Sequence, residues 1–150
     1  MNVCLWWAPP QLTGMPKGKQ VRRKDIGALP LVMPSGTHGL RAIVATAFKQ
    51  AKREPKIVAE IDGLPILMDM ARTGLAATIQ PGAAVSRLPV EAIRRLVQVA
   101  DAGIRRRNLL VSLPEDERSP AALATRIVRK RVVAELLSAS HWMGASLHVS

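Results

Sequence analysis

Short apolar runs alternate with stretches of helical periodicity through most of the chain. The run Leu29–Met33 is too short for a helix, and the small residues Pro34–Thr37 follow it directly. This pattern predicts a buried strand that ends in a loop. Across Leu40–Ala51, apolar residues recur at helical spacing while most cationic residues fall on the other side. An amphipathic helix is therefore expected to begin near Thr37 and to end before Pro55.

The same alternation extends along the rest of the chain. Further apolar or alternating runs predict strands at Val3–Ala8, Lys56–Ile61, Ala76–Ile79, Leu96–Ala100 and Asn108–Leu113. Helical patterns predict one turn at Asp25–Ala28 and a helix at Leu64–Thr73, which Asp62 is expected to cap and Gly74 to end. A long helix is expected from Ser119, its N-cap, to about Ala139. The segment Ala83–Arg95 has a blurred pattern that a helix interrupted by Pro89 would fit. Alternating strands and helices are typical of βαβ units, so the expected class is α/β with a mostly parallel sheet.

The loop Ser35–His38 is the first candidate for chemistry. The free N–H groups of a helix's first turn and the positive end of its dipole attract anions. Here they would lie beside the Ser35 and Thr37 hydroxyls, the His38 imidazole and the Arg41 guanidinium. A simpler interpretation is that Ser35 or Thr37 is only the N-cap and that His38 is an ordinary surface residue. The sequence leaves both interpretations open.

Composition narrows the possible functions. The chain has 150 residues, enough for one domain or two small lobes, and 48% of them are apolar. Aromatic residues make up only 3%, which argues against a stacking platform for single-stranded nucleic acid. Lys and Arg number 22 against 11 acidic residues, and the net charge of +11 attracts anions, including nucleic acid. The single Cys4 allows no internal disulfide, and no signal peptide or membrane span is evident, so we expect a cytoplasmic protein without membrane contact.

Catalytic and metal-binding motifs are scarce. The three histidines, His38, His141 and His148, have no metal-ligand spacing. No GxSxG elbow supports a Ser-His-Asp triad, and Gly36–Gly39 lacks the lysine and third glycine of nucleotide-binding fingerprints. The triplet Arg105–Arg107 is most simply a solvated turn, with a phosphate contact as the alternative. We therefore expect no enzyme activity, no cofactor and no metal.

Several phrases occur in a familiar order. They are Leu29–Ser35 followed by His38–Arg41, then Glu60–Pro65, then Ala71–Pro81, and finally Ser119–Ala122 before the last helix. In this order they resemble the effector-binding, or substrate-binding, domain of LysR-type transcriptional regulators over about residues 3–147. Ala76 and Gln80 depart from the family's usual phrase. The His-Gly-Leu-Arg form is closest to nitrogen-assimilation and carboxylate-responsive members.

The resemblance implies a periplasmic-binding-protein-like fold of type 2, with two α/β lobes and a small effector in the cleft between them. About residues 8–106 would form the second lobe, and about residues 107–140 the returning strand and C-terminal helix of the first lobe. In the family, the loop after the strand at Leu29–Met33 lines the cleft. The candidate ligand-binding residues are therefore Ser35, Gly36, Thr37, His38 and Pro81.

The resemblance also implies partners. The effector would be a small carboxylate or inorganic anion, and the chain would form a homodimer or tetramer. Family members contact DNA through a winged helix-turn-helix domain, and no segment of this chain matches one, so sequence-specific DNA binding by the chain alone is not expected. The leading hypothesis is an effector-sensing domain that controls transcription. The alternative is a basic protein that binds nucleic acid non-specifically through charge, with strong salt dependence.

Overall fold

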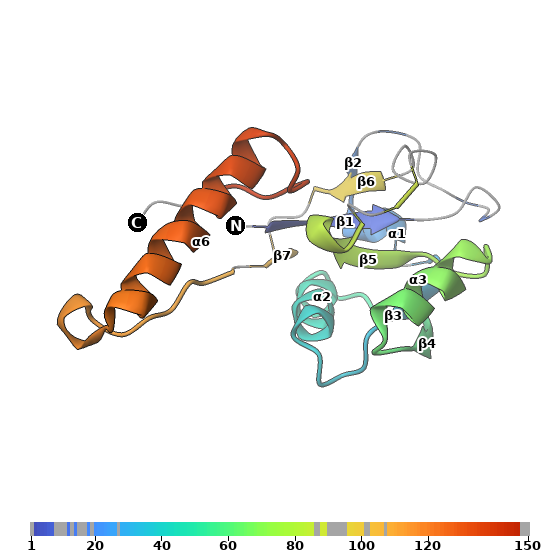
Figure 1. The fold of residues 1–150 in the computed structure, drawn as a ribbon. Coiled ribbons are helices and arrows are strands. Elements are labelled where there is room, and N and C mark those ends of the chain that lie inside the picture. The colour runs from blue at the N-terminus through green and yellow to red at the C-terminus, as the bar shows by residue number, and fades with distance from the viewer. Residues whose placement is uncertain are drawn as a thin grey trace.

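The computed structural model describes residues 2–7, 12, 14, 18, 20–26, 28–85, 88–89, 96–100, 103–106 and 108–147, with the backbone alone at 2–7, 23 and 24. The described strands and helices alternate between residues 20 and 99, and a long C-terminal helix ends the described fold (Figure 1). Among the described residues, no helix is long and apolar enough to cross a membrane. The α/β class expected from the sequence is confirmed.

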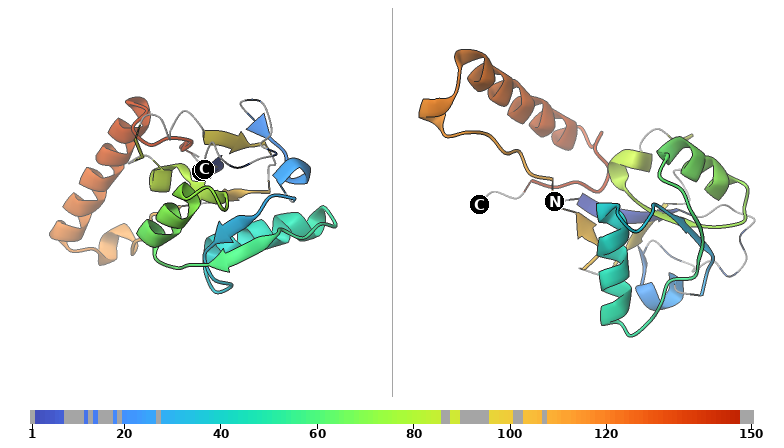
Figure 2. Two further views of the ribbon diagram at one scale, coloured as in Figure 1. Left: turned by 90° about the vertical axis from the view of Figure 1, so that its right-hand side faces the viewer. Right: turned by 90° about the horizontal axis from the view of Figure 1, so that it is seen from below.

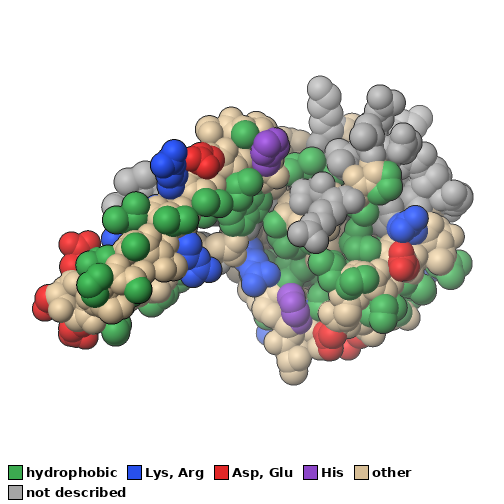
Figure 3. All heavy atoms as spheres, in the orientation of Figure 1, with side chains coloured by type: hydrophobic (Ala, Val, Ile, Leu, Met, Phe, Trp, Pro, Cys, Tyr) green, Lys and Arg blue, Asp and Glu red, His purple; other side chains and the backbone are tan. Residues whose placement is uncertain are grey.

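The C-terminal helix α6 (Pro120–Ser138) stands away from the main body of the molecule (Figure 2). An open segment and one 3-10 turn, η1 (Glu115–Glu117), lead from the body to this helix. None of the residues of α6 is buried. Hydrophobic side chains gather over α6 and over the part of the body beside it (Figure 3). The large apolar side chains exposed here are Leu109, Leu110, Val111, Leu113, Ile127, Val128, Val132 and Leu136.

The larger sheet is arranged around β1 (Asn2–Trp7). This strand pairs antiparallel with β5 (Thr78–Pro81) on one side and with β6 (Leu96–Val99) on the other. The start of β1 also pairs antiparallel with β7 (Arg105–Arg106). At the outer edge, β2 (Gln20–Val21) lies parallel to β6.

A second ladder extends the sheet beyond β5. Strand β3 (Leu31–Met33) pairs parallel with β4 (Ile57–Glu60). A parallel bridge between Leu31 and Ala77 joins this pair to the residues that lead into β5. The described pairings that do not involve β1 are therefore parallel, whereas β1 runs antiparallel to its three partners.

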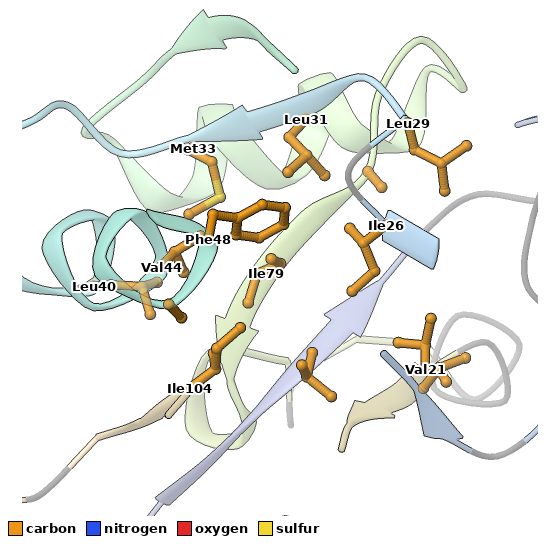
Figure 4. Close-up of a cluster of buried hydrophobic side chains, with 14 of the residues drawn as sticks. Val21, Ile26, Leu29, Leu31, Met33, Leu40, Val44, Phe48, Ile79 and Ile104 are labelled. Carbon is orange, nitrogen blue, oxygen red and sulfur yellow. The ribbon is translucent and has the colours of Figure 1, made fainter. Parts of the chain in front are cut away.

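Helix α2 (Gly39–Gln50) covers one face of the sheet because its apolar residues repeat at helical spacing. Phe48, the only phenylalanine, is fully buried among Met33, Ile79 and other aliphatic side chains (Figure 4). Burial of one such large side chain contributes about 1.5–3 kcal/mol. The labelled members of this cluster are Val21, Ile26, Leu29, Leu31, Met33, Leu40, Val44, Phe48, Ile79 and Ile104.

Helix α3 (Leu64–Arg72) contributes to a second apolar cluster, which forms on the other face of β3. Successive strand residues point to opposite faces, so Val32 packs in this cluster while Leu31 and Met33 pack in the first. The remaining buried members are Leu67, Met68, Ala71, Ala76 and Val85. Both faces of β3 are thus covered, and all three of its residues have no exposed surface.

Most predicted elements are present within about two residues of their expected bounds, which is the usual uncertainty of helix and strand ends. The strand predicted at Ala76–Ile79 lies two residues later as β5, and the turn at Asp25–Ala28 lies two residues earlier as α1 (Arg23–Ile26). Gly74, with φ of 91°, follows the end of α3 as predicted. Ser119 caps α6, because its hydroxyl accepts a hydrogen bond from the Ala122 N–H at 3.3 Å.

Three local predictions are wrong. Helix α2 begins at Gly39, and its N-cap is His38 rather than Ser35 or Thr37. Asp62 does not cap α3, whose N-cap is Gly63 without a side-chain bond. Residues 108–113 form no strand, because they pair with no other strand of the described chain.

The segment 83–95, for which an interrupted helix was expected, is only partly described. It begins with the short helix α4 (Gly82–Val85), and residues 86–87 and 90–95 lie outside the described residues. After α6, the chain returns to the body, where Met143 packs against the second apolar cluster. Gly82 allows this contact, since a β-carbon at this position would lie 1.7 Å from the Met143 carbonyl oxygen.

Replacing Gly82 by Ala is therefore expected to push the returning C-terminal segment off α4. The clash is with backbone, which a rotamer change cannot relieve, and overpacking of this kind costs about 1–3 kcal/mol. Hydrogen exchange of residues 141–146 should become faster, and the midpoint of urea unfolding should fall. Gly39→Ala is the matched control, because a β-carbon there meets nothing within 4 Å. Equal behaviour of the two variants would contradict this packing.

Candidate functional site

Three neighbouring strands end at one edge of the sheet, and a residue of the candidate site lies at or after the end of each strand. His38 lies after β3, Asp62 after β4, and Pro81 is the last residue of β5. Parallel strands bring their carboxyl ends together, and ligands of open α/β sheets bind in the crevice outside those ends. The candidate site is therefore this edge.

The loops after β3 and β4 are joined by one hydrogen bond. The backbone N–H of Ser35 donates to a carboxylate oxygen of Asp62 at 2.9 Å. This bond and, next, the Ser35 hydroxyl lower the pKa of Asp62 below its ordinary value of 3.8; desolvation opposes them, and the nearby His38 adds the smallest lowering effect. Asp62 is therefore a carboxylate at neutral pH and is the acceptor of the site.

His38 has a defined orientation because it caps α2. Its Nδ1 accepts a hydrogen bond from the Leu40 N–H at 3.3 Å. In the neutral ring, the proton then lies on Nε2, which is left as the donor. The Ser35 and Thr37 hydroxyls lie 3.1 Å apart and bond to each other. The Leu40 N–H, in the first turn of α2, is therefore already bonded to His38 and is not free to bind an anion.

A cavity of about 130 Å³ opens at this edge. Its charged residues are Asp62 and Arg106, and Arg106 reaches it from β7. The cavity is lined by Pro34, His38, Leu40, Asp62, Leu64, Leu67, Gln80, Pro81, Ala84 and Arg106. Apolar side chains from α2 and α3 thus form part of its wall, and cationic, anionic and amide groups converge on it.

Gln80 is a buried polar residue in the wall of the cavity. Its side chain is 3% exposed, and its Nε2 donates to the hydroxyl of Thr78, which is fully buried, at 3.1 Å. Buried amides are oriented by such bonds. Among the described residues, no group of three or more His, Cys, Asp or Glu side chains could hold a metal ion.

The structure brings together only some of the predicted site residues. His38 and Pro81 line the cavity, whereas Ser35, Gly36 and Thr37 form a turn beside it and do not. Arg41 was expected beside this turn, but its Nε instead lies 3.6 Å from a carboxylate oxygen of Glu60.

Three polar residues of the cavity were missed by sequence reasoning. Asp62 was interpreted as a helix cap, and Arg106 as part of a solvated triplet. The sequence did draw attention to Gln80, because this residue departs from the sequence that the family usually has at this position. Arg106 had none, because only the pairing of β7 with β1 brings it to this edge.

The lowered pKa of Asp62 predicts how its carboxylate affects stability with pH. A group whose pKa is depressed by folding stabilises the protein above its unfolded pKa and loses this effect as the pH falls through the folded pKa. Asp62→Asn should therefore be less stable than the original chain at pH 7, and the difference should shrink below about pH 4. Urea unfolding at pH 7 and pH 3 measures this. A difference that is the same at both values would show that the charge of Asp62 is not involved.

Comparisons with known proteins agree with this architecture. The family model described as LysR substrate binding domain matches residues 4–130. No curated protein sequence matches the chain significantly.

Three solved structures share the fold. CbnR, a LysR family transcriptional regulator, is 18% identical with a TM-score of 0.57, and the match covers 69% of this chain and 36% of CbnR. Full-length CbnR complexed with target DNA is 21% identical with a TM-score of 0.57, covering 87% of this chain and 44% of that one. The effector binding domain of QuiR in complex with shikimate is 16% identical with a TM-score of 0.58, and the match covers 87% of this chain and 61% of the QuiR chain.

The chain thus spans only about a third to three fifths of the length of these structures. At such low identity, the likeness establishes the periplasmic-binding-protein-like fold and nothing finer. The family match extends over most of the chain, from β1 into α6. The chain therefore belongs to the LysR substrate-binding domain family.

Proposed function

We propose that this chain is the effector-sensing part of a LysR-type transcriptional regulator and that it binds a small carboxylate at the edge where β3, β4 and β5 end. The observation that supports this most is the convergence of His38, Arg106 and Asp62 on one cavity. The role is regulatory rather than catalytic, in a cytoplasmic protein that responds to a metabolite.

The charges at the edge favour an organic acid that also carries hydroxyl groups. Arg106 and the Nε2 of His38 are donors suited to a carboxylate, which guanidinium groups bind with two parallel hydrogen bonds. Asp62 would repel a bare inorganic anion but can accept a bond from a hydroxyl. The QuiR effector domain is in complex with shikimate, a carboxylate with hydroxyl groups, which supports this chemistry for a relative.

The cavity is small for a complete effector site. Pockets for small molecules usually measure about 300–1,000 Å³, against about 130 Å³ here. We propose that it forms one wall of a cleft, with the exposed turn of Ser35, Gly36 and Thr37 making further contacts to the ligand. The opposite wall would come from a first lobe.

Residues 107–140 are proposed to belong to that first lobe. The absence of buried residues in α6 supports this, because an isolated helix gains little stability until its exposed apolar side chains are covered by another part of the protein. The same exposed apolar side chains could instead be covered by a second copy of the chain, in a homodimer or tetramer. DNA contact would require a helix-turn-helix domain outside this chain. Non-specific nucleic-acid binding rests on charge alone, and the family match does not favour it.

Arg106 offers a sharp test, because its neighbour Arg105 carries the same charge on the same strand without lining the cavity. Calorimetric titration with shikimate as the probe should give saturable binding. Arg106→Gln should weaken it by about 1–3 kcal/mol, the cost of removing a hydrogen bond to a charged group. Arg105→Gln should leave the affinity within about 0.5 kcal/mol of the original.

His38→Asn extends this test without removing the helix cap, since asparagine is a good N-cap residue. The variant should remain as stable as the original chain and bind the probe more weakly, because the imidazole Nε2 donor is lost. Equal losses of affinity for Arg105→Gln and Arg106→Gln would contradict a ligand in this cavity. So would unchanged affinity of both Arg106→Gln and His38→Asn.

A further inference from the structure

A second and wider cavity lies between the C-terminal half of α2 and the start of β4. Its volume is about 760 Å³. It is lined by Arg41, Ala45, Lys49, Lys52, Arg53, Glu54, Pro55 and Ile57. None of these residues lines the cavity at the strand ends. We call this surface the basic groove.

Arg41 lies at the inner side of the basic groove. Its side chain is 19% exposed, and its Nε lies 3.6 Å from Glu60. This distance allows an ion pair but not a hydrogen bond, and the Nε has no hydrogen-bond partner among the described residues although it is buried. A buried donor without a partner is destabilising by about 1–3 kcal/mol unless a ligand or water accepts the bond. Arg41 is thus a largely buried cation in the wall of the groove, with Glu60 as its ion-pair partner.

The rim of the groove is held by the backbone at the end of α2. The Arg53 N–H bonds to the Phe48 carbonyl at 3.1 Å, and the Lys52 N–H bonds to the Lys49 carbonyl at 2.9 Å. This pattern is the Schellman motif, in which glycine usually occupies the left-handed position. Here that position is Lys52, with φ of 51°. The chain therefore carries a lysine where glycine would be less strained.

Charge in the groove is poorly compensated. Four cationic residues line it against one acidic residue, Glu54. Lys49, Lys52 and Arg53 form no ion pair with any residue that the structure describes. Like charges gathered around a concave surface focus the potential and raise the local concentration of anions. Ala45, Pro55 and Ile57 add apolar surface beside the charges.

We propose that the basic groove is a second ligand site, which takes a small organic molecule that carries a phosphate group. The phosphate would bind to Lys49, Lys52 and Arg53, with Arg41 adding positive charge from the wall of the groove, and the carbon part would cover the apolar side chains. Arginine and lysine are the side chains that proteins use for phosphate, and the volume suits a metabolite. This site does not depend on the carboxylate proposed for the strand ends.

The test uses the whole chain and calorimetric titration at low ionic strength, with glycerol 3-phosphate, inorganic phosphate and uncharged glycerol as probes. Glycerol 3-phosphate should bind saturably and more tightly than inorganic phosphate, and glycerol should not bind. The double variant Lys49→Gln, Arg53→Gln should lose roughly tenfold or more in affinity. The double variant Arg129→Gln, Lys130→Gln is the matched control, since it removes two cationic charges from the exposed helix α6 and should change affinity by less than about twofold.

Lys52→Gly keeps the test informative if the double variant is unstable. Glycine is favoured at this position, so the variant should be as stable as the original chain or more so, while binding falls. Equal losses in the groove variant and the α6 variant would overturn the proposal, because binding would then reflect net charge. Absence of saturable phosphate binding would also overturn it. A competition with duplex DNA covers the other possible ligand. If DNA binding requires the groove cations and glycerol 3-phosphate does not displace the DNA, the groove binds nucleic acid instead of a phosphorylated metabolite.

Discussion

The rest of the structure depends on the burial of β3 from both sides. Leu31 and Met33 pack with α2, Val32 packs with α3, and all three are without exposed surface. Its backbone is paired on both edges as well, with β4 on one side and with the residues before β5 on the other. Shifting this strand by one residue would exchange its two faces and uncover both clusters. The position of every group beyond its carboxyl end is therefore determined by packing.

This constraint explains why a polar site forms where it does. The chain must leave the buried strand through the loop after Met33, and the loop is fixed to the end of β4 by the bond from Ser35 to Asp62. His38 is fixed in turn, because it caps α2. The side chains that converge there are held by short links to rigid elements, which limits the reorganisation needed when a ligand binds.

The sequence predicted the elements of the core well because their signals are local. Periodicity identified α2 and α3, and Gly74 and Ser119 identified helix ends through backbone conformation and a capping bond that involve only neighbouring residues. The strand predicted at residues 108–113 failed, because an apolar run becomes a strand only when another strand pairs with it. Asp62 and Arg106 were misjudged for a related reason. Their roles come from Ser35 and from the pairing of β7 with β1, which are contacts across the fold.

The central claim is that a ligand binds at the carboxyl ends of β3, β4 and β5. Nuclear magnetic resonance of the isotopically labelled chain, titrated with shikimate, tests it residue by residue. The account predicts that the largest amide shifts occur at His38, Asp62 and Gln80, and that amides of α6 such as Lys130 do not move. Shifts that are largest in α6 or in the basic groove, with the strand ends unchanged, would contradict it.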